Sequence, residues 1–108
     1  MRSNRATMQH DLFVNPSRKE RQGFPFLVDL QARAVESQYR IVAPLTPVPP
    51  RSLTTRLVPI VEHNGQHYAV LFNLITNLST RLLRHPVGSI AHYRDDLTRA
   101  LDWLFFGI

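Results

Sequence analysis

Asn64-Gly65 carries the strongest local signal for structure in this sequence. The dipeptide separates two apolar segments, residues 57–63 and 66–72. Asparagine and glycine both accept the positive φ angles that a two-residue hairpin turn requires. The sequence therefore predicts an antiparallel hairpin that runs from residue 57 to residue 72.

Four more segments have the composition of short strands: residues 10–14, 26–30, 39–45 and 80–83. A polar connection, residues 32–38, separates two of them, and the charged segment 18–23 is expected to be an exposed, mobile loop. Prolines then interrupt the chain at Pro44, Pro47, Pro49 and Pro50. Because proline cannot donate a hydrogen bond to a neighbouring strand, we expect no central strand in that stretch.

The C-terminal segment has the periodicity of a helix. Its apolar residues recur at steps of three and four: Ile90, Tyr93, Leu97, Ala100, Leu101, Leu104 and Phe105. Ser89 is a candidate N-cap, Asp95 and Asp96 suit the N-terminal half, and Gly107 stands where a helix would stop. With five or six short antiparallel strands before it, this helix predicts a small α+β domain. Its sheet would be twisted or barrel-like, with the helix sealing one face.

The last residues form an unusually apolar chain end. Trp103 and Phe106 fall off the apolar stripe and share the polar face with Asp96, Arg99 and Asp102. Two aromatic residues beside an arginine are typical of a binding hot spot. Another part of the fold, or a second copy of the chain, could equally cover them.

Composition limits the possible classes of protein. A chain of 108 residues with 44% hydrophobic residues fits one globular domain, residues 8–108, and the patternless residues 1–7 are expected to be a disordered extension. The absence of cysteine excludes disulfides and thiolate metal sites. No segment is apolar and long enough to span a membrane, and the N-terminus lacks a signal-peptide core, so we expect a cytoplasmic protein.

The net charge of +5 favours an acidic partner, either nucleic acid or an acidic protein segment. The arginines are scattered from Arg2 to Arg99, which weakens the case for nucleic acid. A generally basic, soluble surface accounts for the charge equally well.

Motifs for catalysis are missing. The four glycines stand apart and form no phosphate-binding loop. His63 and His67 flank the hairpin turn but have no third ligand, and Asp95 and Asp96 point in different directions on a helix. No serine lies in a nucleophile motif. We therefore expect a binding protein without metal or cofactor rather than an enzyme.

Five segments in order resemble the CcdB family, the toxins of CcdA/CcdB toxin–antitoxin modules. They are the start at Met8-Gln9, the strand Phe26–Gln31, the segment Arg40–Leu45 with its Pro-Leu ending, Leu57–Val61 before the hairpin, and the apolar helix followed by Gly107-Ile108. The resemblance runs from about Met8 to Ile108. It implies a twisted antiparallel sheet with a smaller sheet and a C-terminal helix, assembled as a homodimer.

The resemblance also implies a function. CcdB proteins bind the GyrA subunit of DNA gyrase and trap the enzyme on cleaved DNA, through three terminal residues that correspond here to Phe106, Gly107 and Ile108. Trp103 lies one helical turn away and joins this candidate site. DNA would be contacted only indirectly, through gyrase or the antitoxin. Phe106 replaces the family's tryptophan, and Asn77-Leu78-Ser79 replaces a typical Ser-Val-Pro.

The family's antitoxin has an acidic, disordered C-terminal segment that wraps the toxin. Arg18, Lys19 and Arg21 are the candidate contacts for a CcdA-like partner, although they also suit a solvated loop.

Two other readings remain open. The MazF/PemK endoribonucleases share the CcdB fold, and their early loop of the form Gln-Gly-x-Arg-Pro resembles Arg21–Pro25. Here Phe24 precedes the proline where those enzymes have a catalytic arginine, and phenylalanine can neither stabilise a phosphorane nor transfer a proton. The third reading is a non-toxic homologue that retains only antitoxin binding.

Overall fold

The computed structural model describes residues 8–108, so the expected disordered extension at residues 1–7 lies outside the described part of the chain. The strands are β1 (Asp11–Val14), β2 (Phe26–Asp29), β3 (Tyr39–Pro47), β4 (Ile60–His63), β5 (Gln66–Val70), β6 (Thr76–Ser79) and β7 (Gly88–Ser89). One α-helix, α1 (Arg94–Phe106), follows them. Four single-turn 3-10 helices lie in the connections: Glu20–Gln22, Phe72–Leu74, Thr80–Leu82 and Ala91–Tyr93.

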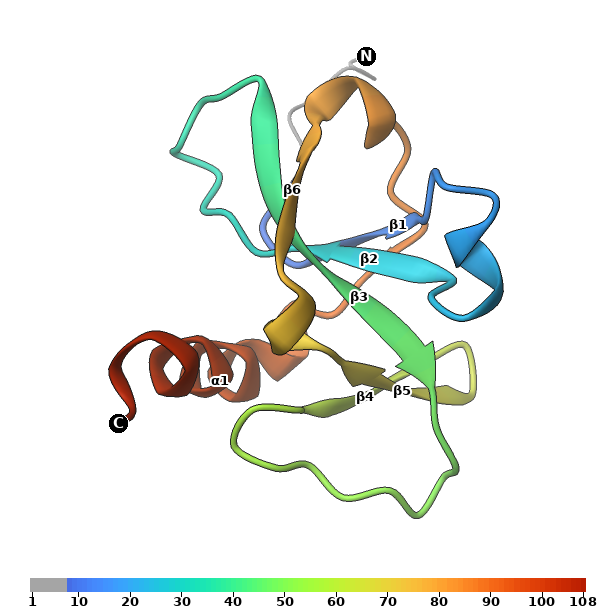
Figure 1. Cartoon of the computed structure of the whole chain (residues 1–108), viewed down its shortest axis with the longest axis vertical. Coiled ribbons are helices and arrows are strands. Elements are labelled where there is room, and N and C mark those ends of the chain that lie inside the picture. Colours follow the sequence, from blue (N-terminus) through green and yellow to red (C-terminus); the bar gives the residue numbers. More distant parts are fainter. Residues whose placement is uncertain (1–7) are drawn as a thin grey trace.

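The strands form one antiparallel sheet with the order β4-β5-β3-β2-β1-β7, and β6 also pairs with β3. Figure 1 shows the long strand β3 crossing the middle of the molecule, with β6 beside its first half and β5 beside its second half. The sheet is strongly curved and nearly closes on itself. This arrangement confirms the predicted α+β class with a barrel-like sheet and one C-terminal helix.

The prediction that the proline-rich stretch could not contain a central strand was wrong. β3 continues through Pro44 to Pro47 and pairs with strands on both sides. On the side away from β2, its pairing with β6 ends at Val42 and its pairing with β5 begins at Leu45. Pro44 therefore lies where one partner strand replaces the other. The Pro44 carbonyl accepts a hydrogen bond from Leu71 N (2.9 Å). Because neither β5 nor β6 pairs with Pro44, the N–H that proline lacks removes no hydrogen bond from the sheet.

The predicted strand at residues 80–83 was also wrong. Thr80–Leu82 form a 3-10 helix, and the strand lies just before it, at β6. Ser79 Oγ accepts a hydrogen bond from Arg81 N and so caps the 3-10 turn. Leu83 is 2% exposed, which explains its apolar character without a strand.

The hairpin between β4 and β5 confirms the Asn64-Gly65 prediction. Asn64 has a φ of 51° and Gly65 a φ of 81°, as a type I′ turn requires. His63 pairs with Gln66 directly across the turn.

Apolar side chains alternate between the two faces of the sheet and build two clusters. The larger cluster lies between the sheet and α1 and includes Leu12, Val28, Leu45, Phe72, Ile90, Leu97 and Ala100. The smaller cluster, on the opposite face, contains Phe13, Leu27, Val42 and Leu83. Neighbouring residues such as Leu12 and Phe13 belong to different clusters because successive side chains of a strand point to opposite faces.

The helix begins later than the sequence predicts. Ser89 belongs to β7 and is not the N-cap of α1. Its Oγ accepts a hydrogen bond from the backbone N of Ala91, the first residue of the 3-10 turn Ala91–Tyr93, whose N-cap is Ile90. The N-cap of α1 is Tyr93, whose hydroxyl accepts from Glu62 N at the edge strand β4. Asp95 and Asp96 lie in the first turn of the helix, as expected.

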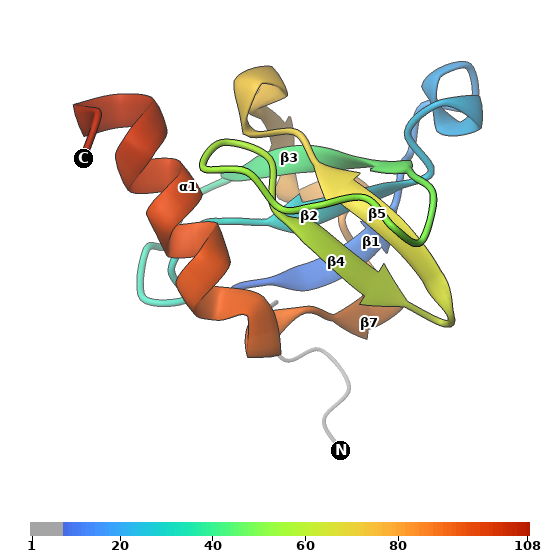
Figure 2. The ribbon, with the colours of Figure 1, turned by 90° about the horizontal axis from the view of Figure 1, so that it is seen from below.

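Only part of the predicted apolar stripe is buried. Leu97 and Ala100 pack into the larger cluster, whereas Leu104 is 37% and Phe105 64% exposed. Figure 2 shows α1 lying across one side of the sheet, with its C-terminal turns extending past the strands. Leu104 and Phe105 belong to the apolar stripe that the sequence predicts but do not pack into the core, because no sheet lies beneath the end of the helix.

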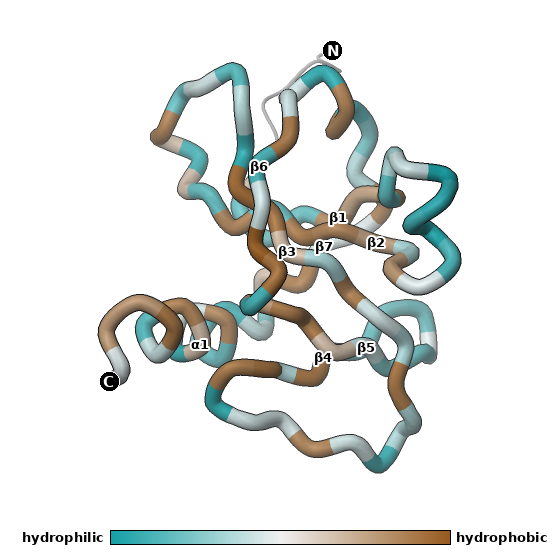
Figure 3. Tube along the Cα trace, viewed as in Figure 1, coloured by the Kyte–Doolittle hydropathy of each residue, from teal (hydrophilic) through white to brown (hydrophobic). Residues whose placement is uncertain are grey.

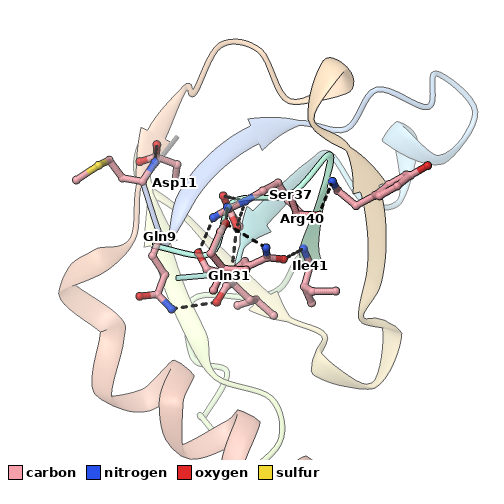
Figure 4. A network of polar contacts seen from close by, with 11 residues as sticks. Gln9, Asp11, Gln31, Ser37, Arg40 and Ile41 are labelled. Carbon is pink, nitrogen blue, oxygen red and sulfur yellow. Dashed lines mark hydrogen bonds and ion pairs between the residues drawn. The ribbon is translucent and has the colours of Figure 1, made fainter. Parts of the chain in front are cut away.

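A buried polar network organises the connection between β2 and β3 (Figure 4). Arg40 Nε lies 3.0 Å from Asp29 Oδ2. The other guanidinium nitrogens of Arg40 donate to the carbonyls of Val35 (3.0 Å) and Gln31 (2.6 Å). Arg40 therefore binds a carboxylate and two points of the connecting loop with one rigid donor group.

Candidate functional site

The C-terminal tail is the most exposed apolar part of the helix. Phe106 is 72% and Ile108 is 85% exposed. Gly107 adopts the left-handed conformation with a φ of 69°, and its N–H donates to Trp103 O (3.0 Å), which confirms the predicted helix stop. Figure 3 shows hydrophobic residues continuing to the end of α1 at the periphery of the molecule. The helix thus presents an aromatic ring and an aliphatic side chain on either side of a glycine turn.

Trp103 has a different environment from Phe106. Its side chain is half-buried, and the guanidinium carbon of Arg56 lies 4.6 Å from the centroid of the indole ring. Arg56 comes from the connection between β3 and β4, so another part of the fold covers this aromatic residue. Trp103 and Phe106 therefore do not form one uniformly exposed aromatic surface.

A groove of about 380 Å³ lies between α1 and the β3–β4 connection. We call it the Arg56–Trp103 groove. It is lined by Thr54, Thr55, Arg56, Asp96, Arg99, Trp103 and Ile108. Sequence analysis missed Arg56, because its aromatic partner lies in a distant segment and no local pattern marks the pair.

Comparison with protein-family models matches residues 9–107 to the CcdB protein family. The chain belongs to the CcdB family. Members of this family are toxins of toxin–antitoxin modules, and the membership supports that class for this chain. A search of curated proteins found no match.

The basic residues named above as candidate antitoxin contacts lie away from the tail. Arg18, Lys19 and Arg21 are all exposed on the β1–β2 connection. Figures 1 and 2 both show this connection and the C-terminus at different ends of the molecule. Arg21 Nε donates to Asn15 O (2.8 Å), whereas Arg18 and Lys19 form no ion pair with any residue from 8 to 108. The structure therefore does not bring the two sets of predicted site residues together.

The same connection contains the segment that resembles the MazF/PemK loop. Phe24 is half-buried, its N–H donates to Glu20 O (2.9 Å) and its carbonyl accepts from Asn15 Nδ2 (2.9 Å). These bonds fold the connection into a tight turn around Asn15. Phe24 brings no group capable of acid–base chemistry to this turn.

His63 has a packing role in this CcdB fold. Its ring lies edge-on to Phe26, with ring centroids 5.3 Å apart. The ring also packs so closely on Gly88 that a Cβ at that position would stand 2.6 Å from His63 Cε1.

Within the described residues, no three histidine or acidic side chains are placed to hold a metal ion. The helices of the described residues are all too short or too polar to cross a membrane.

Proposed function

We propose that this CcdB-family chain is a toxin that binds the GyrA subunit of DNA gyrase and traps the complex of gyrase with cleaved DNA. The observation that supports the proposal is the solvent-exposed tail Phe106-Gly107-Ile108 at the end of a CcdB-family fold. The aromatic ring suits stacking on an arginine of gyrase, the glycine lets the chain turn, and the isoleucine suits a small pocket.

The active form in this proposal is a homodimer. Two tails related by a twofold axis engage two GyrA subunits at once, which raises the overall affinity by avidity. Leu104 and Phe105, near the end of α1, are apolar and exposed, which supports an interface in which a second copy of the chain covers them. Sedimentation at micromolar concentration is expected to give twice the chain mass of 12.5 kDa, and a species of 12.5 kDa would contradict the dimer.

A CcdA-like antitoxin with an acidic, disordered segment neutralises the toxin in this proposal. The net charge of +5 speeds capture of such a segment by long-range attraction, and Arg18, Lys19 and Arg21 offer it exposed cations. The protein acts in the cytoplasm and reaches DNA only through gyrase or the antitoxin.

Expression in bacteria without antitoxin tests the proposal. The expected result is growth arrest with double-strand DNA breaks and an SOS response, together with gyrase–DNA cleavage complexes in a purified system. Arrest without DNA damage but with cleaved messenger RNA would identify a ribonuclease instead. Normal growth together with antitoxin binding would identify a non-toxic homologue.

A further inference from the structure

Another pocket lies at the start of α1, at the end of the helix opposite to the tail. It has a volume of about 510 Å³. Its lining comes from residues 8–11 at the start of β1, from Arg33 in the β2–β3 connection, and from Ser89, Ala91 and Arg94 around the start of α1. We call it the Arg33–Arg94 pocket. None of these residues lines the Arg56–Trp103 groove, so the two sites are separate.

Two arginines give this pocket a positive charge. Arg33 and Arg94 are both exposed, and neither guanidinium forms an ion pair or a hydrogen bond with any residue from 8 to 108. Asp11 contributes a carboxylate to the lining, and its Oδ2 accepts from Met8 N (2.9 Å). Two guanidinium groups outnumber this carboxylate, and their N–H groups are available to a ligand.

His10 adds a buried imidazole to the same lining. The residue is 5% exposed, and its ring forms no hydrogen bond with any residue from 8 to 108. Two backbone hydrogen bonds fix its position, from His10 N to Asp29 O (2.6 Å) and from Ile90 N to His10 O (2.9 Å). Burial, followed by the charge of Arg94, lowers the pKa of His10, so at neutral pH the uncharged ring keeps one N–H donor. A buried polar ring without a hydrogen bond is costly, and a ligand acceptor in the pocket would remove that cost.

The arrangement of these donors suits a phosphate better than a carboxylate. A carboxylate has two oxygens in one plane, whereas the phosphate of a monoester has three terminal oxygens in a tetrahedral arrangement. The two guanidinium groups come from different segments of the chain, and each can bind phosphate oxygens with its forked donors. Ser89 Oγ accepts from Ala91 N (3.2 Å), which leaves the hydroxyl hydrogen of Ser89 free to donate to a third oxygen.

The size and the apolar part of the pocket indicate an organic phosphate. A volume of about 510 Å³ lies in the range of sites for small organic molecules and exceeds what inorganic phosphate fills. Met8, which is 41% exposed, and Ala91 contribute apolar surface to the lining. The thioether of a methionine packs favourably against a flat aromatic ring. A ligand that uses the whole pocket therefore joins a phosphate to a flat ring system.

We propose that the Arg33–Arg94 pocket binds a nucleoside monophosphate. The phosphate binds the guanidinium groups of Arg33 and Arg94 and accepts hydrogen bonds from His10 and Ser89, and the base packs against Met8. This inference goes beyond the proposed function and does not rest on it, because the pocket shares no residue with the tail Phe106-Gly107-Ile108.

A nuclear magnetic resonance titration of the full-length, isotope-labelled protein tests the proposal. The probe is adenosine monophosphate, with adenosine and inorganic phosphate titrated separately. We expect adenosine monophosphate to cause saturable shifts of the backbone amide signals of residues 9–11 and 89–94, which surround the pocket. Inorganic phosphate should shift the same signals with at least about tenfold weaker affinity, and adenosine should shift none of them at concentrations up to about 10 mM.

Two substitutions test the arginines. Arg33→Gln and Arg94→Gln should each weaken the binding of adenosine monophosphate about tenfold, since each removes a charge-assisted interaction. Both side chains are exposed and unpaired within residues 8–108, so we expect both variants to fold. Arg51→Gln is the matched control, because Arg51 is an exposed arginine outside the pocket. It removes the same charge and should leave the affinity within about twofold of the native value.

Four results would overturn the proposal. They are no saturable shift with adenosine monophosphate, equal affinity for adenosine, equal affinity for inorganic phosphate, and equal weakening by Arg51→Gln and the two pocket variants. The first three come from the native protein, so the test does not depend on the folding of a variant. Because the titration contains no gyrase, its failure is distinguishable from failure of the tail to trap gyrase.

Discussion

Arg40 on β3 reaches back to Asp29 at the end of β2, and the pair is almost completely buried, with side chains 7% and 0% exposed. The same guanidinium binds the carbonyls of Gln31 and Val35. A connection that is exposed along most of its length is thereby attached to the core at two points. The pair also joins two adjacent strands of the sheet, so its removal affects both the loop and the core.

Arg40→Met is expected to destabilise the protein by about 3–5 kcal/mol, because it removes the guanidinium that binds the buried carboxylate of Asp29. Arg40→Lys should destabilise it less, since it keeps a charge but loses the forked geometry. Denaturant unfolding measures both. Arg84→Met, at an exposed arginine, is the control and should change stability by about 0.5 kcal/mol or less. An unchanged unfolding midpoint for Arg40→Met would show that the Arg40–Asp29 pair does not stabilise the folded protein.

Stability is expected to fall as the pH drops below neutrality, because of His10. Burial, followed by the charge of Arg94, lowers the pKa of His10 below the ordinary value of 6.5, against a smaller opposing effect of Asp29. The unfolded chain therefore takes up a proton at His10 more readily than the folded chain does. The stabilisation is complete above pH 6.5 and is lost as the pH falls from there through the lower folded pKa.

Urea unfolding between about pH 7.5 and pH 5 tests this prediction, with His10→Asn as the comparison. Asparagine suits the positive φ of 71° at this position and carries no titrating group. The variant should lose less stability than the native protein over the same range. Parallel pH profiles would assign the effect to other groups.

Deletion of Gly107 and Ile108 is expected to abolish gyrase trapping but to cost about 1 kcal/mol of stability or less. Both residues are exposed, and within residues 8–108 the deletion removes one hydrogen bond, from Gly107 N to Trp103 O. Cleavage-complex assays and thermal unfolding should be run on the same preparations. Equal trapping by the full-length and shortened proteins would rule out the tail as the gyrase contact.

Phe106→Ala is expected to weaken gyrase trapping by up to about thirtyfold, which corresponds to about 2 kcal/mol for an aromatic ring on a desolvated arginine. Phe106→Trp should preserve or raise potency, since the indole is larger and binds cations more strongly. Leu53→Ala, at an apolar side chain on the β3–β4 connection that is 83% exposed, controls for a general loss of apolar surface. If Phe106→Ala traps as well as the native protein, this ring is not a contact; if it unfolds the protein, the ring stabilises the fold instead.

Local chemistry made several features predictable. The hairpin turn follows from Asn64 and Gly65, and the end of α1 follows from Gly107, because these residues tolerate positive φ angles whatever surrounds them. The buried strands β2 and β3 were recognisable from their continuous apolar runs. The resemblance to the CcdB family was likewise readable along the chain, and the family match over residues 9–107 confirms the family.

Other features depended on which distant segments came together. Pro44 sits in a central strand because β5 replaces β6 as its neighbour there, and Phe105 is exposed because the sheet ends before the helix does. Arg56 stacks on an aromatic ring because α1 places the Trp103 ring centroid 4.6 Å from its guanidinium carbon. The sequence by itself determined the turns, the helix stop and the apolar tail, since these depend on backbone preferences within a few residues. The tertiary structure decided burial, strand partners and the groove, since these depend on contacts between segments far apart in the chain.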